Sequence, residues 1–198
     1  MTSTMTIITN DNVKKLSMFN SLVHSILVSI NSSLYLCNYI DLNTLKKYYA
    51  ISIYYFIIDY IIILNYYDLK DKICYFFHHL ITSYILYIFL YENEEDDELN
   101  KVIAQGFTAE FPIIFLNINW FLIKYKKQNT KLFRVCDHLT IITYFIFRIC
   151  NFTYLLFVNY YKYEFIIKLF SIVYAMNAIW FAILLKRFQC NCLKYKKD

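Results

Sequence analysis

The chain has 198 residues, of which 59% are hydrophobic and 18% are charged, with a single glycine and a single proline. Soluble domains carry roughly 45–50% apolar and about 25% charged residues, so one water-soluble core cannot hide this apolar content. The formal net charge of +5 is not gathered into one basic stripe with a recognisable motif, which argues against nucleic-acid binding.

Long apolar segments follow one another along most of the chain. A membrane-spanning helix needs about 20 mostly apolar residues. The sequence predicts six such helices, at Leu16–Cys37, Tyr48–Tyr67, Ile73–Tyr91, Lys101–Ile123, His138–Val158 and Phe165–Leu185. We therefore expect an all-α, polytopic membrane protein whose six transmembrane helices form a bundle.

Two of the predicted spans are unusually polar. The first is diluted by serine, asparagine and His24, and the fourth contains Glu110, two asparagines and Pro112, which would kink a helix. Polar groups at membrane depth are tolerated only where they face protein or a cavity rather than lipid. The bundle is therefore expected to surround a polar-lined cavity.

The basic residues predict the orientation of the chain. Of the twenty lysines and arginines, the loops on one side receive only Lys46, Lys47, Lys101, Lys162 and Lys168, and Arg148 lies within a span. Because lysine and arginine are enriched in cytosolic loops, both termini should be cytosolic. This divides the chain into a cytosolic tail (1–15), a transmembrane domain (16–187) and a cytosolic basic tail (188–198). The acidic run 92–98 then lies in a lumenal loop, as a solvated segment or, alternatively, a cation-binding one.

The C-terminal tail carries a short targeting signal. Lys194 and Lys196 stand fifth and third from the last residue of the printed sequence, the spacing of the dilysine signal for retrieval to the endoplasmic reticulum. The tail therefore predicts recognition by a coat protein. The first thirteen residues lack the features of a secretory signal peptide.

A resident metal is not expected. Cys74 and His78 have the i, i+4 spacing of a helical ligand pair, which is weak evidence by itself. The multi-histidine boxes of membrane di-iron enzymes cannot be built from four histidines. We expect neither a metal nor a tightly held cofactor.

Ionisable groups inside the predicted spans are the main functional candidates, because burying them in a bilayer is costly. Together with two amides, they are His24, Asp59, His78, His79, Glu110, Arg148, Asn117 and Asn177. They are distributed over all six predicted helices, which indicates one shared polar interior. Their alternative role is to hold the helices together by interhelical hydrogen bonds. An imidazole beside a carboxylate in a dry cavity also suits general acid–base or acyl-transfer chemistry.

The order of these polar groups resembles the TLC-domain family, which includes the ceramide synthases and several small membrane proteins. The similarity extends from about Leu16 to Arg187 and is greater to the small branch than to the synthases. It is carried by Asn20–Ser25, Tyr54–Asp59, Phe77–Leu80, Ala109–Pro112, Asn117–Phe121, Phe147–Ile149 and Met176–Trp180.

The resemblance implies a six-helix barrel around a cavity for a lipid acyl chain, in the endoplasmic reticulum or a related membrane. In the synthases, paired histidines and downstream aspartates are linked to acyl transfer from acyl-coenzyme A to a sphingoid base. Here His78 and His79 match the pair, and Glu110 stands where the synthases have an aspartate-containing motif. A second aspartate is not evident, which argues against ceramide synthesis.

The sequence thus leads to a role in lipid homeostasis with two sets of candidate residues. The catalytic candidates are His78, His79, Glu110 and Asp59. The lipid-binding or charge-balancing candidates are His24, Arg148, Asn117, Trp120 and Asn177. One hypothesis is a lipid acyltransferase with acyl-coenzyme A as co-substrate. The alternatives are a non-catalytic lipid-sensing or trafficking protein and, less favoured, a proton-coupled transporter. Membrane lipids are the expected partners, and a homo-oligomer is left open.

Overall fold

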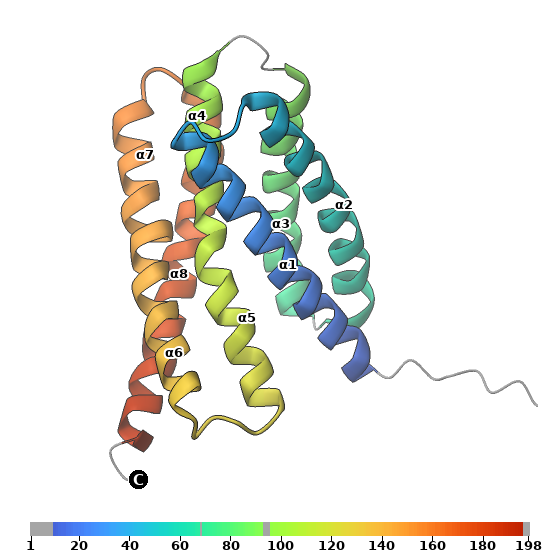
Figure 1. Cartoon of the computed structure of the whole chain (residues 1–198), viewed down its shortest axis with the longest axis vertical. Helices are drawn as coiled ribbons and strands as arrows, with labels where there is room; N and C mark the ends of the chain where they lie inside the picture. The colour runs from blue at the N-terminus through green and yellow to red at the C-terminus, as the bar shows by residue number, and fades with distance from the viewer. Residues whose placement is uncertain (1–9, 68, 93–95, 196–198) are drawn as a thin grey trace, which may run out of the picture.

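The computed structural model describes residues 10–67, 69–92 and 96–195, and its regular structure there is entirely helical. The helices join end to end into six rods (Figure 1). The first two rods are α1 (Asn10–Leu36) and α2 (Leu42–Tyr66). The third is α3 (Leu69–Tyr87), extended by the π-helical turn Ile88–Glu92. The fourth consists of α4 (Asp97–Phe107), the 3-10 turn Thr108–Glu110 and α5 (Phe111–Lys124).

The last two rods form the remaining side of the bundle. The fifth consists of α6 (Lys131–Tyr144), the π-helical turn Phe145–Cys150 and α7 (Asn151–Asn159). The sixth is the single long helix α8 (Glu164–Tyr195). This architecture confirms the predicted all-α fold.

Four of the described rods are long and apolar enough to cross a membrane: α2, α4–α5, α6–α7 and α8. The chain is therefore a multi-pass integral membrane protein. The polar fourth segment is among these four, whereas α1 and α3 are not among them within the described residues. Six spans therefore remain a prediction, although all six rods exist.

The buried serine hydroxyls of α1 are hydrogen-bonded within the helix and the bundle. Ser25, Ser29 and Ser32 are buried and donate to backbone carbonyls one turn earlier, at 2.5–2.6 Å. Ser32 also bonds the hydroxyl of Tyr49 in α2 at 2.7 Å. Hydroxyls bonded in this way can lie in an apolar interior without an unsatisfied donor. This explains how a serine-rich helix fits inside a membrane bundle.

The fourth rod is irregular beside Pro112, and the kink predicted there stays a prediction. Pro112 lies in the first turn of α5, immediately after the 3-10 turn. Proline has no N–H with which to bond the carbonyl of Thr108. The N–H of Phe111 bonds that carbonyl instead, and this i to i+3 bond forms the 3-10 turn that carries Glu110.

The rods pack into a closed ring. Each rod contacts the next one around the ring, in the order α1, α2, α3, α8, the α6–α7 rod and the α4–α5 rod. The α4–α5 rod in turn contacts α1 and closes the ring. The start of α1 and the end of α8 lie at the same end of the bundle, together with the α2–α3 and α5–α6 connections (Figure 1). We call this the terminal end and the other the far end. This placement of the start of α1 and the end of α8 agrees with an even number of crossings.

The far half of the bundle is filled by an apolar core. Tyr49, Phe89 and Ile103 are fully buried there, and the rings of Phe89 and Phe107 each lie 4.8 Å from the ring of Tyr49. Aromatic and aliphatic side chains thus pack closely against one another there. A ligand-sized cavity is instead found in the terminal half.

The described part of the acidic run is tied to neighbouring rods. The side chain of Asp96 caps α4 and accepts from Tyr163 at 3.1 Å. Asp97 accepts from Tyr35 at 3.0 Å, and Glu98 pairs with Lys162. These contacts connect the start of α4 to α1 and to the α7–α8 connection.

Candidate functional site

A cavity of about 330 Å³ lies in the terminal half of the bundle. All six rods contribute to its wall, and each of them supplies at least one polar or aromatic side chain. These include Ser17 from α1, Asp59 from α2, His78 and His79 from α3, Glu110 and Trp120 from the fourth rod, Arg148 from the fifth and Trp180 from α8. The shared polar interior expected from the sequence therefore lines a cavity.

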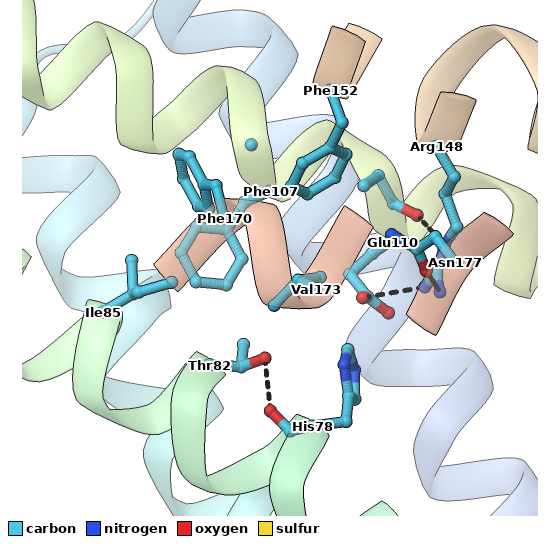
Figure 2. Close-up of a pocket in the computed structure, with 12 residues that line it drawn as sticks. His78, Thr82, Ile85, Phe107, Glu110, Arg148, Phe152, Phe170, Val173 and Asn177 are labelled. Carbon is cyan, nitrogen blue, oxygen red and sulfur yellow. Dashed lines mark hydrogen bonds and ion pairs between the residues drawn. The ribbon is translucent and has the colours of Figure 1, made fainter. Parts of the chain in front are cut away.

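Arg148 connects three rods at the inner end of this cavity. It is 3% exposed and lies in the π-helical turn of the fifth rod. Its Nε donates to the carbonyl of Ala109 at 2.7 Å, Nη1 to Asn177 Oδ1 at 2.9 Å, and Nη2 to Glu110 Oε1 at 3.1 Å (Figure 2). A buried guanidinium needs such a full set of acceptors, since a buried charge without partners is very costly. All three nitrogens of Arg148 are thus engaged by the protein itself.

Asp59 forms a second polar centre. Ser17 Oγ donates to Asp59 Oδ1 at 2.7 Å, and His79 Nε2 lies 3.0 Å from Asp59 Oδ2. Tyr55 adds a longer hydroxyl bond to the same carboxylate at 3.5 Å. The carboxylate is buried and is held by residues from three helices. This arrangement fixes its position beside the imidazole of His79.

Both paired histidines line the cavity, although adjacent helical residues point about 100° apart. Their ring centroids lie 5.5 Å apart, and the ring of His78 stands edge-on to Trp180 at 5.7 Å. Among the described residues, Nδ1 of each histidine has no hydrogen-bond partner, and His79 Nε2 has only the ion-pair contact with Asp59. The described residues therefore leave hydrogen-bonding capacity of both imidazoles unused, at nitrogens that are buried in the cavity wall.

Of the other site residues predicted from the sequence, some line the cavity and others do not. His24 is buried in the wall, where its ring stacks on Tyr55 at 3.9 Å, and it does not line the cavity. Asn117 lines the cavity and donates to Ser21 Oγ at 3.0 Å. Trp120 also lines it. Asn177 lies deeper, beneath Arg148, and lines a second space.

This second space has a volume of about 30 Å³, and Figure 2 shows the residues that line it. His78, Glu110 and Arg148 line both cavities and so separate them. The rest of its wall is mostly apolar and includes Phe107, Phe152, Phe170 and Val173. We call Asp59, His78, His79, Glu110, Arg148 and Asn177 the polar layer.

Sequence reasoning missed several residues of the cavity wall. Ser17 and Ser21 are one helical turn apart and precede His24 by seven and three residues, so all three share one face of α1. That spacing was a usable signal. Arg187 is not among the candidate site residues predicted from the sequence, yet it lines the cavity too.

The described side chains contain no group of three or more histidine, cysteine, aspartate or glutamate residues that could hold a metal ion. The side chain of Cys74, half of the i, i+4 pair, lies outside the described residues. Lys196 lies outside them as well, and so does the side chain of Lys194. The dilysine signal, the endoplasmic reticulum and the cytosolic termini remain predictions.

A closed ring of six helical rods, four of them long and apolar enough to cross a membrane, surrounds a polar layer and defines a polytopic helical membrane protein with an internal cavity. The family model for the TLC domain matches residues 13–188. The chain therefore belongs to the TLC-domain family, which confirms the resemblance drawn from its motifs; membership of the small branch stays a prediction. No curated protein and no solved structure matches the chain.

Proposed function

We propose that this protein binds the acyl chain of an amphiphilic lipid in its larger cavity and acts in lipid homeostasis, in the membrane of the endoplasmic reticulum with both chain ends in the cytosol. The observation that carries the proposal is the composition of the cavity wall. Ile113, Leu116 and Ile183 supply apolar surface, and the polar layer stands at the inner end. A cavity of about 330 Å³ is within the usual range for ligand sites, about 300–1,000 Å³.

The proposal can be tested on protein purified in a mild uncharged detergent, by native mass spectrometry of the lipid that stays bound. Leu116→Trp should displace the lipid, because the larger side chain fills the cavity. Ile179→Trp is the matched control, since Ile179 is 64% exposed on α8 and does not line the cavity. Absence of lipid from the wild type, or equal retention by both variants, would refute the proposal.

A second candidate function is acyl transfer, and one observation favours it. His79 Nε2 lies 3.0 Å from a buried carboxylate, while its Nδ1 is buried without a hydrogen-bond partner among the described residues. A carboxylate that holds one imidazole nitrogen orients the ring and stabilises the imidazolium that forms when the other nitrogen takes a proton, as in the catalytic triads of hydrolases. His79 is thus suited to act as a general base towards a molecule in the cavity.

The reaction would proceed as follows. The Nδ1 atom of His79 accepts a proton from a lipid amine or hydroxyl as that group attacks the carbonyl carbon of an acyl-coenzyme A thioester. The new amide or ester bond forms, the carbon–sulfur bond breaks, and the proton passes to the leaving thiolate. Asp59 stabilises the transient imidazolium. Glu110 and Arg148 hold the helices around the reacting groups.

Lipidomics on membranes from cells expressing matched amounts of each variant separates the two functions. His79→Ala should abolish a lipid product that the wild type forms, and His138→Ala should not, because His138 is exposed outside the cavity. If His79→Ala leaves every lipid class unchanged but purified protein retains lipid, the non-catalytic function stands.

A further inference from the structure

Arg187 occupies the outer part of the cavity wall. It lies on α8 in line with Trp180 and Leu184, at helical spacings that place all three on one face. It is ten residues beyond Asn177, so it lies about 15 Å along the helix axis from the polar layer, towards the terminal end. The side chain is half-buried and borders the same cavity as the histidines.

The guanidinium of Arg187 differs from that of Arg148 in its bonding. Whereas Arg148 uses all three nitrogens (Figure 2), Nη2 of Arg187 is shielded from solvent without a hydrogen-bond partner among the described residues. A buried nitrogen of a charged group without an acceptor is costly. An acceptor supplied by a ligand would remove that cost once the guanidinium turned its Nη2 towards the cavity.

The protein does not offer Arg187 an anion of its own within the described wall. The two carboxylates that line the cavity are Asp59 and Glu110. Asp59 is bonded by Ser17 and lies beside His79, and Glu110 is paired with Arg148. Both belong to the polar layer at the inner end, so neither serves Arg187.

We propose that Arg187 binds the phosphate group of an amphiphile whose acyl portion extends along the cavity to the polar layer. This inference rests on the proposed lipid-binding function and names the chemistry of the ligand's head. Arginine suits this role because its planar guanidinium matches a phosphate with two parallel hydrogen bonds. The apolar surface of Ile183, Leu184 and Ile123 covers the path between the head and the layer.

Two sources could supply such a phosphate. One is an acyl thioester carrier such as acyl-coenzyme A, whose phosphates are separated from the thioester by a long arm. The other is the head group of a membrane phospholipid, where phosphate and ester lie closer together. In both cases the phosphate would bond Arg187 in the same way, so the two sources are distinguished by probes that carry one or the other kind of phosphate.

The test compares binding of three probes to purified protein in an uncharged maltoside detergent: palmitoyl-coenzyme A, dipalmitoyl phosphatidic acid and uncharged monopalmitoylglycerol. The variants are Arg187→Gln, Arg187→Lys and, as control, Lys186→Gln, which removes the same charge from an adjacent exposed residue. Thermal unfolding of each variant without a probe checks that it folds. Dissociation constants are measured by microscale thermophoresis.

We expect Arg187→Gln to weaken binding of at least one phosphate-bearing probe about tenfold or more. Arg187→Lys should weaken it less, and Lys186→Gln by less than about twofold. Monopalmitoylglycerol should bind equally well to all variants. An effect on palmitoyl-coenzyme A alone identifies the thioester carrier, and an effect on phosphatidic acid alone identifies the phospholipid.

Equal affinity of the wild type and Arg187→Gln for both phosphate probes would overturn the proposal. A parallel loss of monopalmitoylglycerol binding would overturn it as well, because Arg187 would then support the cavity rather than recognise phosphate. If the wild type binds monopalmitoylglycerol but neither phosphate probe, the inference fails while lipid binding survives. If no probe binds the wild type, lipid binding itself fails.

Discussion

Arg148 Nη1, on the fifth rod, donates to Asn177 Oδ1 of α8 at 2.9 Å, while Nη2 of the same guanidinium bonds Glu110 on the fourth rod at 3.1 Å. One side chain thereby joins three rods at the boundary between the two cavities. The contacts lie in a largely buried environment, where salt screens them much less than at the surface. They therefore bear on stability as well as on the shape of the site.

Removal of this arginine should destabilise the bundle strongly. Arg148→Met leaves Glu110 and Asn177 without their main partner, and breaking a buried pair from one side costs about 3–5 kcal/mol. The free energy of unfolding, measured in mixed detergent micelles with increasing dodecyl sulfate, should fall by that order. The double variant Arg148→Met/Glu110→Leu should be less destabilised than Arg148→Met alone. A double variant at least as unstable as the single one would show that the ion pair is not the main contribution.

Gly106 should not tolerate even a methyl group. An ideal Cβ atom at this position would lie 2.6 Å from Cζ of Phe170, so Gly106→Ala forces the aromatic ring to move. Overpacking of this kind costs about 1–3 kcal/mol, and Phe170→Leu should recover part of it in the Gly106→Ala background. Thermal unfolding of the single and double variants measures the coupling. Additive effects of the two changes would contradict the close approach.

Ser17 should hold Asp59 in place. Ser17→Ala removes the 2.7 Å hydrogen bond to the carboxylate, and a hydrogen bond to a charged group contributes about 1.5–3 kcal/mol. Ser33→Ala is the matched control on the same helix, because Ser33 is exposed and its hydroxyl donates only to the backbone carbonyl of Ser29, one turn earlier. We expect the control to change the unfolding free energy by less than about 0.5 kcal/mol. Equal effects of the two substitutions would show that the contact with Asp59 does not contribute.

The start of α1 should respond to acid. Hydrogen bonds from Lys124 and then Lys15 lower the pKa of Asp11 below its ordinary value of 3.8. Because the folded-state pKa is lowered, the stabilisation is fully present above the ordinary value and is lost as the pH falls through the lowered one. Titration of the Asp11 carboxyl carbon by nuclear magnetic resonance should give a pKa below 3.8, and Lys124→Gln should raise it. An unchanged pKa in Lys124→Gln would exclude the contact as its cause.

Much of the fold could be predicted from the sequence because it depends on local properties. The length of each apolar segment decides which parts of the chain can cross a bilayer, and all six predicted segments correspond to rods. Pro112 perturbs the fourth rod for a reason already present in its missing N–H. The cost of placing charge in lipid likewise predicts that Asp59, Glu110 and Arg148 face the interior of the bundle, and all three line its cavity.

The pairing of those polar groups was decided only by the tertiary structure. Asp59 lies beside His79 and Ser17, and Arg148 binds Glu110 and Asn177. His24 is buried in the cavity wall, where its ring stacks on Tyr55, whereas Arg187 lines the cavity. These outcomes depend on the rotation and axial shift of each helix relative to its neighbours, which the 3-10 and π-helical turns modify at Glu110 and Arg148. Hydropathy and helical periodicity describe one segment at a time. They therefore determined which residues enter the bundle, whereas packing between helices determined which of them meet.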